Sequence, residues 1–344
     1  MVNHGHGLGS QKNIGENDSV REIRRILFIR TDRMGDLLMN LPALRVLRQA
    51  HPKAWIALLA DCPVSDFFKN HPDLDEVIAI EAAGVLQNRR KRWELVRKIR
   101  AIHFDLAVAS NSSKFFHGLL FLSGIPIRVG WRRKWSFLLN RSLPDTKDKA
   151  IRHEIDSNLD LIGLISDKKW DGGFTLPEDE KSTEKICALL AGCDATLPVV
   201  VVHPGTSNPK KRWPAEHFIE LCERLLSTDQ CRVVLIGGEE EADLSQKIVK
   251  QLSKPALDLT GRLTLKELAA FFKQPQVKTL VSSDSGPVHV AWMSGKPVVV
   301  FYAMNVDGCH PARWGPRDGK SEVIFKPMNE INVDEVWERV QSFL

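Results

Sequence analysis

The sequence contains no apolar run long enough to cross a membrane and no cysteine pattern typical of a metal site. Its longest uncharged apolar stretch, Phe115 to Ile127, has 13 residues, whereas a membrane span needs about 18 to 20. No C-x-x-C pair is present, and no histidine cluster completes a zinc pattern. Scattered cysteines of this kind predict reduced core residues in a cytosolic protein: Cys62, Cys187, Cys193, Cys222, Cys231 and Cys309.

A secretory signal is also missing from the start of the chain. The first 19 residues have no apolar segment, so residues 1–23 are predicted to form a disordered extension. The length of 344 residues suits two domains of about 150 residues each. With 43% hydrophobic and 26% charged residues, the composition is that of a globular protein and excludes disordered, collagen-like and disulfide-scaffold classes.

Positive charge is concentrated in one part of the chain. Residues 86–153 contain 16 Lys or Arg against four Asp or Glu, a local net charge of +12, whereas the whole chain carries +5. A basic region on an otherwise acidic chain indicates an anionic partner: a membrane surface, a phosphorylated lipid or a nucleic acid. A solvated helix face is the alternative interpretation.

Short apolar runs alternate with helical patterns in the first half of the chain. Buried strands are predicted at 26–30, 55–60, 77–80 and 105–109, and a basic amphipathic helix at 86–102. Strands that alternate with helices predict a parallel sheet covered by helices on both faces.

A second alternating set begins near residue 198. Strands are predicted at 199–203, 232–236, 279–282 and 298–302, and helices at 214–227, 239–252, 265–273, 288–294 and 333–343. The fold class is therefore α/β, with two doubly wound, Rossmann-like domains that face each other across a cleft. The predicted boundaries are 24–175 for the N-terminal domain, 176–330 for the C-terminal domain and 331–344 for a final helix. In such sheets ligands bind at the carboxyl ends of the strands.

The loop after the first predicted strand reads Thr31-Asp32-Arg33-Met34-Gly35-Asp36. Asp36 stands where a helix begins, and a carboxylate in that place can take a proton from a substrate hydroxyl. Asp is equally a favoured residue for capping a helix N-terminus. Spacing alone does not separate these two roles.

The loop HPGTSNPKKRWP, residues 203–214, follows the strand at 199–203. A helix comes next, and its N-terminus adds to an anion site. The loop therefore predicts a phosphate clamp, although it is not a Walker loop. A solvated basic loop is the alternative. Candidate groups are the N–H groups and hydroxyls of Gly205, Thr206 and Ser207 and the charges of Lys210, Lys211 and Arg212.

Two further loops of the second half carry polar groups at strand ends. Glu241 closes GGEEE, where a carboxylate can hold ribose hydroxyls; charge pairing with a helix N-terminus is the favoured alternative. In SSDSGPVHVAW, Ser285 and Gly286 bring N–H groups to a helix N-terminus. Asp284 and His289 can bind hydroxyls or phosphate there, while a satisfied core histidine is the alternative for His289. The C-terminal half would thus hold a nucleotide diphosphate donor, and the N-terminal half the acceptor and the base.

Four segments in order resemble glycosyltransferase family 9, the bacterial heptosyltransferases. They are ILFIRTDRMGDLLMNLPALRVLRQAHPKAWI, HPGTSNPKKRWPAEHF, LIGGEEE and SSDSGPVHVAWMSGKPVVVFY. The resemblance covers roughly residues 24–344. It implies a GT-B fold and an inverting, metal-independent sugar transfer. It also implies a cytoplasmic enzyme that works at the inner membrane on a lipopolysaccharide core, with ADP-heptose as the typical donor and no cofactor.

The resemblance also implies roles for individual residues. Asp36 would be the general base, Lys211 would bind the donor phosphates and Glu241 would hold the donor ribose. The segment around Leu263 would lie against the nucleotide base. Other donor contacts would come from Thr206, Ser207, Asp284, Ser285, Gly286 and His289. After VVVFY the chain reads Ala303-Met304-Asn305, where the family usually has a Gly-Pro-Thr-like turn.

The basic region has a role under this resemblance. An anionic glycolipid or oligosaccharide acceptor would be drawn to Arg33, Arg89, Arg90, Arg92, Arg132 and Arg133. Three tryptophans lie among these charges and are predicted to anchor at a lipid interface: Trp93, Trp131 and Trp135. A cytoplasmic enzyme with peripheral contact to the inner membrane is the resulting expectation.

Other functions fit parts of this pattern. One is a family-9-like transferase with a different nucleotide sugar or glycan acceptor, and another is a nucleotide-sugar epimerase or hydrolase on the same fold. A non-catalytic protein that binds anionic lipid or nucleic acid is an alternative of another class. The full set of loop motifs speaks against that last reading, and because aromatic RNA-binding signatures are absent, no nucleic-acid partner is expected.

Overall fold

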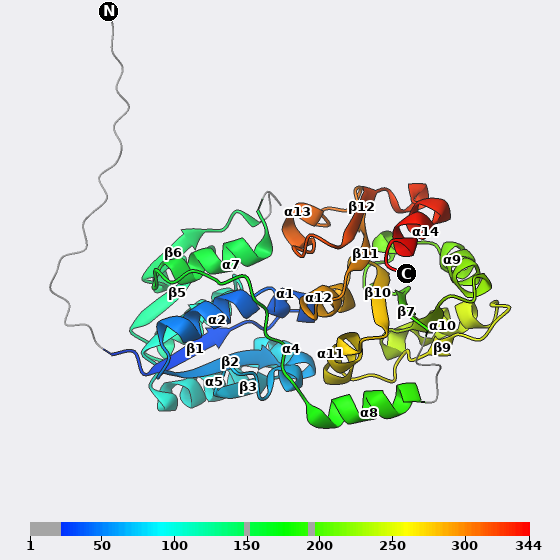
Figure 1. The fold of residues 1–344 in the computed structure, drawn as a ribbon. Coiled ribbons are helices and arrows are strands. Elements are labelled where there is room, and N and C mark those ends of the chain that lie inside the picture. The colour runs from blue at the N-terminus through cyan, green and yellow to red at the C-terminus, as the bar shows by residue number, and fades with distance from the viewer. Residues whose placement is uncertain (1–21, 148–151, 192–196) are drawn as a thin grey trace, which may run out of the picture.

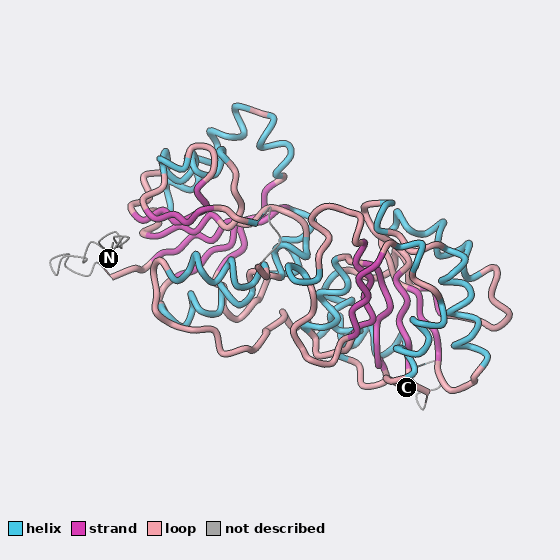
Figure 2. The backbone as a smooth tube through the Cα atoms, turned by 90° about the horizontal axis from the view of Figure 1, so that it is seen from above, coloured by secondary structure: helices cyan, strands magenta, loops and turns pink. Residues whose placement is uncertain are grey.

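The computed structural model describes residues 22–147, 152–191 and 197–344, so most of the predicted extension at 1–23, together with Cys193, lies outside the described residues. The chain forms two lobes, each built on a parallel sheet (Figure 2). In spatial order the first sheet consists of β3 (Glu76–Ile80), β2 (Trp55–Asp61), β1 (Arg25–Ile29), β4 (Leu106–Ala109), β5 (Ile127–Arg132) and β6 (Arg141–Pro144).

The second sheet repeats this topology. In spatial order it consists of β12 (Glu322–Lys326), β11 (Val298–Ala303), β10 (Val277–Ser283), β7 (Val199–His203), β8 (Arg232–Leu235) and β9 (Leu257–Asp258). Both sheets follow the strand order 3-2-1-4-5-6 of dinucleotide-binding folds. The predicted α/β class with two Rossmann-like domains is therefore confirmed.

The central strands are apolar along their whole length because helices cover both faces of each sheet. All five residues of β7 are buried, and β1 is buried from its second residue onward. Parallel sheets covered in this way have continuous hydrophobic strands rather than alternating ones. This is why the sequence located these two strands to within one residue.

Helices flank both sheets (Figure 1). The first unit contains α1 (Met34–Leu38), α2 (Leu41–Ala50), α3 (Cys62–Ser65), α4 (Ala82–Gln87), α5 (Arg89–Ile102), α6 (Lys114–Leu122) and α7 (Glu154–Gly163). The second contains α8 (Glu180–Ala191), α9 (Ala215–Ser227), α10 (Ala242–Val249), α11 (Leu265–Lys273), α12 (Gly286–Met293), α13 (Pro311–Trp314) and α14 (Val333–Gln341). Helix α14 packs on α9 and α8 packs on α11.

The helix predicted at 86–102 is in fact two helices, α4 and α5. Asn88 separates them, and its side chain accepts hydrogen bonds from the backbone N–H groups of Arg90 and Lys91. Asparagine is a favoured residue at a helix N-terminus because its short side chain satisfies these otherwise unpaired donors. The prediction of one helix was wrong because it followed the apolar spacing and ignored this capping residue.

The predicted cysteine environment holds only in part. Cys222, Cys231 and Cys309 are buried, whereas Cys62 and Cys187 are exposed, and all five are free thiols. No helix within the described ranges is long and apolar enough to span a bilayer.

Several contacts join the units, and two of them lie near the middle of the molecule. Helix α1 of the first unit packs against α12 of the second, as Figure 1 shows. Nearby, the Arg33 guanidinium donates a hydrogen bond of 3.2 Å to Ser207 Oγ in the loop after β7. The loops at the carboxyl ends of both sheets therefore face one another.

Candidate active site

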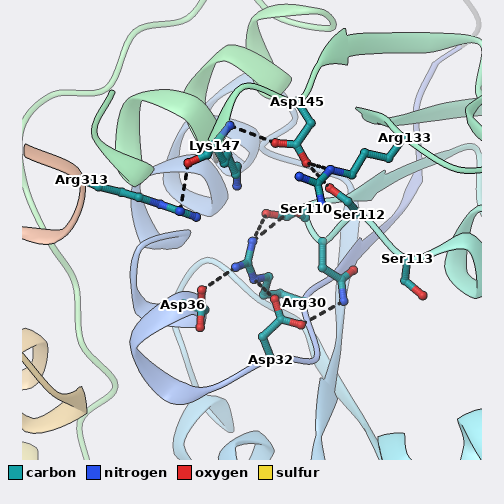
Figure 3. Close-up of a pocket in the computed structure, with 11 residues that line it drawn as sticks. Arg30, Asp32, Asp36, Ser110, Ser112, Ser113, Arg133, Asp145, Lys147 and Arg313 are labelled. Carbon is teal, nitrogen blue, oxygen red and sulfur yellow. Dashed lines mark hydrogen bonds and ion pairs between the residues drawn. The ribbon is translucent and has the colours of Figure 1, made fainter. Parts of the chain in front are cut away.

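A polar pocket lies where the loops after β1 and β4 meet. Strand order reverses between these two neighbouring strands, and such a reversal opens a crevice at the carboxyl ends of an α/β sheet. The pocket has a volume of about 350 Å³ (Figure 3). It is defined by Arg30, Asp32, Asp36, Ser110, Asn111, Ser112, Ser113, Arg133, Asp145, Lys147 and Arg313.

Arg30, the residue after β1, is buried and binds three carboxylates. Its guanidinium lies 3.0 Å from Asp32 Oδ2, 2.8 Å from Asp36 Oδ1 and 3.6 Å from Glu154 Oε1. It also donates a hydrogen bond of 3.0 Å to the Ser110 carbonyl. A planar guanidinium with five donors suits such a crowded acidic site. Arg30 thus fixes the position of the Asp36 carboxylate.

Asp36 lies in the first turn of α1, with 24% of its side chain exposed. The N-cap of α1 is Arg33, and the Asp36 carboxylate pairs with Arg30. The capping interpretation of Asp36 is therefore wrong. Burial raises the pKa of Asp36; Arg30 opposes this rise, Asp32 and Glu154 add to it, and the pKa lies above its ordinary value. A raised pKa brings a carboxylate closer to the range that suits a general base.

The second unit contributes a cation to the polar pocket. Arg313 of α13 donates two hydrogen bonds of 3.2 Å to Glu154 Oε2, and Glu154 is fully buried. Lys147 pairs with the same carboxylate, and its ammonium lies 4.6 Å from the centre of the Trp131 ring. Burial lowers the pKa of Lys147 and its ion pair with Glu154 offsets part of the shift.

A larger cleft of about 770 Å³ lies between the units, where strand order reverses at β7 and β10. Helix α1 borders it from the first unit, and the loops after β7, β8 and β10 border it from the second. This interdomain cleft includes every predicted donor-binding residue except Leu263: Thr206, Ser207, Lys211, Glu241, Asp284, Ser285, Gly286 and His289. Leu263 packs against the hydrophobic core, and Leu265 lines the cleft two residues further on.

Lys211 supplies the positive charge of the interdomain cleft. Its ammonium lies 2.7 Å from Asp284 Oδ2, and each side chain is at most one fifth exposed. Burial lowers the pKa of Lys211, but the Asp284 carboxylate outweighs that effect and the net shift is upward. Lys211 is therefore a fixed cation. The neighbouring Lys210 is exposed and does not line the cleft.

Glu241 is held by its own loop and by His203 at the end of β7. Its Oε2 accepts a hydrogen bond of 2.7 Å from the Gly238 backbone N–H and lies 3.4 Å from His203 Nε2. The helix-terminus interpretation of Glu241 is thus confirmed, while the carboxylate also faces the cleft. A Cβ on Gly205 would lie 1.8 Å from Glu241 Oε1, so any side chain at that position would displace the Glu241 carboxylate.

The N-terminus of α12 opens into the cleft beside His289. Ser285 is the N-cap of this helix, and the positive end of the helix dipole favours an anion there. Burial lowers the pKa of His289 to about 4, so its ring is neutral at pH 7. A Cβ on Gly35 would lie 2.8 Å from His289 Cδ2, which shows how closely α1 approaches α12.

Asp36 lines both the polar pocket and the interdomain cleft. Lys211, Asp284 and Ser285 lie on the cleft side of Asp36, and the serines after β4 lie on the pocket side. A carboxylate between a phosphate-type site and a hydroxyl-rich pocket can serve a proton transfer between their two ligands.

The predicted acceptor-binding arginines separate into groups. Arg133 lines the polar pocket and lies 2.9 Å from Asp145 Oδ2. Arg33 lines the interdomain cleft instead. Away from both, Arg89 and Arg92 border an apolar groove, Arg90 pairs with Glu94, and Arg132 donates to the Ser142 carbonyl.

Trp131 is not an interfacial residue. It is 3% exposed, and its indole N–H donates a hydrogen bond of 2.9 Å to the Ser110 carbonyl inside the first unit. The prediction that Trp131 anchors at a lipid interface was wrong, because alternation along β5 places its side chain inward. Trp93 and Trp135 are exposed as predicted.

Sequence reasoning missed several residues of the polar pocket. Lys147 and Arg313 lie far apart in the chain, and neither follows a strand predicted from sequence. Ser110 and Asn111 directly follow the strand predicted at 105–109, and that position was a signal that could have identified them. Among the described residues, no group of three or more His, Cys, Asp or Glu side chains is placed to hold a metal ion.

Comparisons with known proteins agree with this arrangement. Residues 92–334 match the family model for glycosyltransferase family 9 (heptosyltransferase). The chain is 24% identical over 323 residues to lipopolysaccharide heptosyltransferase 2 of Escherichia coli K12, with 87% of each chain covered.

Solved structures show the same fold. A glycosyl transferase family 9 structure from Veillonella parvula superposes with a TM-score of 0.85 at 21% identity, covering 95% of this chain and 99% of the other. E. coli ADP-heptose lps heptosyltransferase II superposes with a TM-score of 0.77 at 23% identity, covering 93% and 98%. Since the family model matches more than two thirds of the chain, this protein belongs to glycosyltransferase family 9 and is a glycosyltransferase.

Proposed function

We propose that this enzyme transfers a heptose, or a closely related sugar, from an ADP-sugar to an anionic acceptor of the lipopolysaccharide-core type. This proposal rests chiefly on the position of Asp36, which lines both the interdomain cleft and the polar pocket. The names of the E. coli relatives support the choice of ADP-heptose and lipopolysaccharide as substrates of that class.

The donor would occupy the interdomain cleft. Its diphosphate would replace Asp284 as the partner of Lys211 and would face the N-terminus of α12 at Ser285. A fixed ammonium and a helix dipole stabilise the negative charge that grows on a leaving phosphate, and groups held in place for that purpose need no reorganisation during the reaction. These protein groups supply the stabilisation, so the proposed transfer needs no metal ion.

The acceptor would occupy the polar pocket. Three cations, Arg133, Lys147 and Arg313, suit carboxylate or phosphate groups, and the serines after β4 suit sugar hydroxyls. Asp36 would take the proton of the attacking hydroxyl. That oxygen would form the new bond to the anomeric carbon on the face opposite the bond to the nucleoside diphosphate, which breaks with its electron pair. The configuration at the anomeric carbon would therefore invert.

The first test is thermal unfolding of the protein with ADP, UDP, GDP, CMP and ADP-heptose over a range of concentrations. A ligand at about 100 times its dissociation constant stabilises a protein by about 2.7 kcal/mol, which moves the unfolding midpoint clearly. We expect ADP and ADP-heptose alone to stabilise. Selective stabilisation by UDP or GDP would retain a glycosyltransferase but refute the ADP-sugar, and no response to any nucleotide would refute the proposal.

A transfer assay with ADP-heptose then tests the reaction itself. ADP release should require an anionic core acceptor and should persist in the presence of a chelator. Release of ADP without any acceptor would indicate a hydrolase, and loss of transfer on chelation would refute the metal-free mechanism.

A further inference from the structure

The first unit carries an exposed apolar face that its fold does not explain. Among the described residues eight large apolar side chains are strongly exposed, and six of these lie between residues 86 and 137. Scattered apolar residues are ordinary on a protein surface, but a contiguous patch marks an interaction site. The six are Leu86, Trp93, Phe121, Leu122, Trp135 and Phe137.

These side chains gather around one groove. Leu86, Trp93, Leu122 and Trp135 line a depression of about 700 Å³ bordered by α4, α5, α6 and the short 3-10 helix η2 (Ser136–Leu138). Phe121 adjoins Leu122 on α6, and Phe137 lies on η2. A helix that faces water normally shows polar residues on that side. The outer side of α6 instead shows two exposed apolar residues, so it is suited to a partner other than water.

Trp135 has an unusual backbone at the edge of the groove. Its φ is +63°, a left-handed conformation that bulky residues adopt only at an energetic cost. Its indole packs over Gly118 of α6 and is still 51% exposed. About half of this side chain therefore stays open to solvent, although the backbone that presents it is strained. A strained residue that presents an aromatic ring to the outside is typical of a functional surface.

Cations surround the apolar side chains. Arg89 and Lys114 are exposed at the groove, and the guanidinium of Arg92 lies 5.7 Å from the centre of the Phe115 ring. Arg128 lies 5.6 Å from the centre of the Phe121 ring. Residues 86–153 carry a net charge of +12. Aromatic and aliphatic side chains within a ring of Lys and Arg complement an anionic bilayer surface.

We propose that this apolar–basic face, defined by Leu86, Arg89, Trp93, Lys114, Phe121, Leu122, Trp135 and Phe137, docks on an anionic phospholipid bilayer. Its aromatic side chains would enter the headgroup region while its cations contact lipid phosphates. Ser113 lines both the apolar groove and the polar pocket. Docking would thus bring the acceptor pocket to the membrane surface, where a lipid-borne acceptor is found; this last step alone rests on the proposed function.

Vesicle co-sedimentation of the full chain, without donor or acceptor, tests the proposal. The probes are phosphatidylcholine vesicles and vesicles in which roughly one third of the lipid is phosphatidylglycerol. Binding is expected only to the anionic vesicles and is expected to weaken as salt is added. Arg89→Gln with Lys114→Gln should weaken it by about fivefold per charge. The matched pair Lys250→Gln with Lys320→Gln, exposed on the second unit, should have no effect.

The contribution of the apolar side chains to vesicle binding is tested with a variant that should leave the fold intact. Trp135→Asn places a residue that tolerates positive φ at the strained position, so the unfolding temperature should hold while vesicle binding falls at least about tenfold. Met304→Ser, which removes an exposed apolar side chain from the second unit, is the control and should bind vesicles normally. Every variant should retain its affinity for ADP.

Three results would overturn the proposal. They are equal binding to both vesicle types, normal vesicle binding by Trp135→Asn, and a self-association of the free protein that Trp135→Asn abolishes while vesicle binding persists. The last would identify the face as a contact between two copies. Because no step uses the sugar donor or acceptor, these results are independent of the transfer assay.

Discussion

At the scale of single residues, the Asp36 carboxylate is partly buried beside Asp32 and Glu154, with Arg30 as its counter-charge. General base catalysis contributes about 10²- to 10⁴-fold to a rate. We expect Asp36→Asn to lower turnover by that amount and to leave ADP affinity nearly unchanged, because its charge is not needed for donor binding. Steady-state transfer kinetics and an ADP titration measure the two quantities. Turnover at the level of the unmodified enzyme would refute the base assignment.

The stability of the same variant tests the environment of Asp36. A carboxyl whose pKa is raised in the folded state stabilises the fold at low pH, and this contribution is lost as pH rises through the raised pKa. Asparagine resembles the protonated carboxyl. At neutral pH the Asp36→Asn variant should therefore have an unfolding temperature equal to or above that of the unmodified protein. A clearly lower unfolding temperature would indicate that the ion pair of Asp36 with Arg30 is chiefly structural.

Asp32 offers a second prediction, on pH dependence. The Asp32 carboxylate raises the pKa of Asp36 and also shares the Arg30 guanidinium. A base must be deprotonated to act, so kcat/KM rises with pH through the pKa of Asp36. Asp32→Asn should move this rising limb to lower pH, since it removes one negative charge beside Asp36 and leaves only Glu154 to share Arg30 with it. A pH profile measures the shift, and an upward movement of the limb would contradict it.

Lys211 and Lys210 form a natural pair for a third prediction. Lys211 faces the interdomain cleft beside Asp284, and Lys210 is exposed outside it. A charge-assisted hydrogen bond contributes about 1.5 to 3 kcal/mol, so Lys211→Ala should weaken ADP binding about 10- to 100-fold. Lys210→Ala should bind ADP normally, which separates a specific contact from the general charge of the loop. Equal losses in the two variants would favour a solvated basic loop.

At the scale of elements, the local sequence was enough to predict secondary structure where a strand is apolar along its whole length and a loop and a helix follow it directly. Strand β7 and helix α11 were predicted to the residue. The loops after β7 and β10 were predicted to be anion sites, and residues of both loops line the interdomain cleft. Strand β5, IRVGWR, was not predicted because two arginines interrupt its apolar residues, and β6, RSLP, because it has only four residues and begins with a charge. Their place in the sheet comes from pairing with β4 and with each other, which no local pattern encodes.

The contact between α1 and α12 supports a fourth prediction. Gly35 lets α1 approach His289, and a Cβ there would lie 2.8 Å from the ring. Gly35→Ala should push α1 away from α12 and displace the adjacent Asp36, and displacements of about 1 Å can cost 10²-fold in rate. We expect turnover to fall at least about tenfold while the protein still folds.

Gly163→Ala is the control for that variant. Gly163 ends α7, and an added Cβ there meets nothing within 4 Å. Alanine is favoured over glycine in a helix by about 0.5 to 1 kcal/mol, so Gly163→Ala should be slightly stabilising and fully active. Full activity of Gly35→Ala would show that the approach of α1 to α12 does not set the position of the base.

At the scale of the whole molecule, the polar pocket is assembled from residues that the sequence keeps far apart. Arg30 follows β1, Lys147 follows β6, and Arg313 comes from α13 of the other unit. The residues of the interdomain cleft could be predicted because their loops each follow one recognisable strand. In the polar pocket Asp36 and Arg133 were predicted, but Lys147 follows a strand that was not predicted and Arg313 comes from the other unit.

Arg313 and Arg317 provide the last prediction, on communication between the units. Both arginines belong to the second unit and both pair with carboxylates of α7. Arg313 pairs with buried Glu154, and Arg317 pairs with Asp156, whose side chain is about one third exposed. Of the two, only Arg313 lines the polar pocket.

Arg313→Ala should raise the KM for the acceptor about tenfold or more, because a charge-assisted contact from across the cleft is lost. The affinity for ADP should stay within about twofold of that of the unmodified enzyme. Arg317→Ala removes a surface pair of the kind that contributes at most about 1 kcal/mol, so its acceptor KM should be unchanged. Acceptor titrations at saturating donor decide between these outcomes. Equal effects of the two variants would mean that the two ion pairs with α7 merely hold the units together. An effect of Arg313→Ala alone would show that the second unit completes the acceptor pocket of the first.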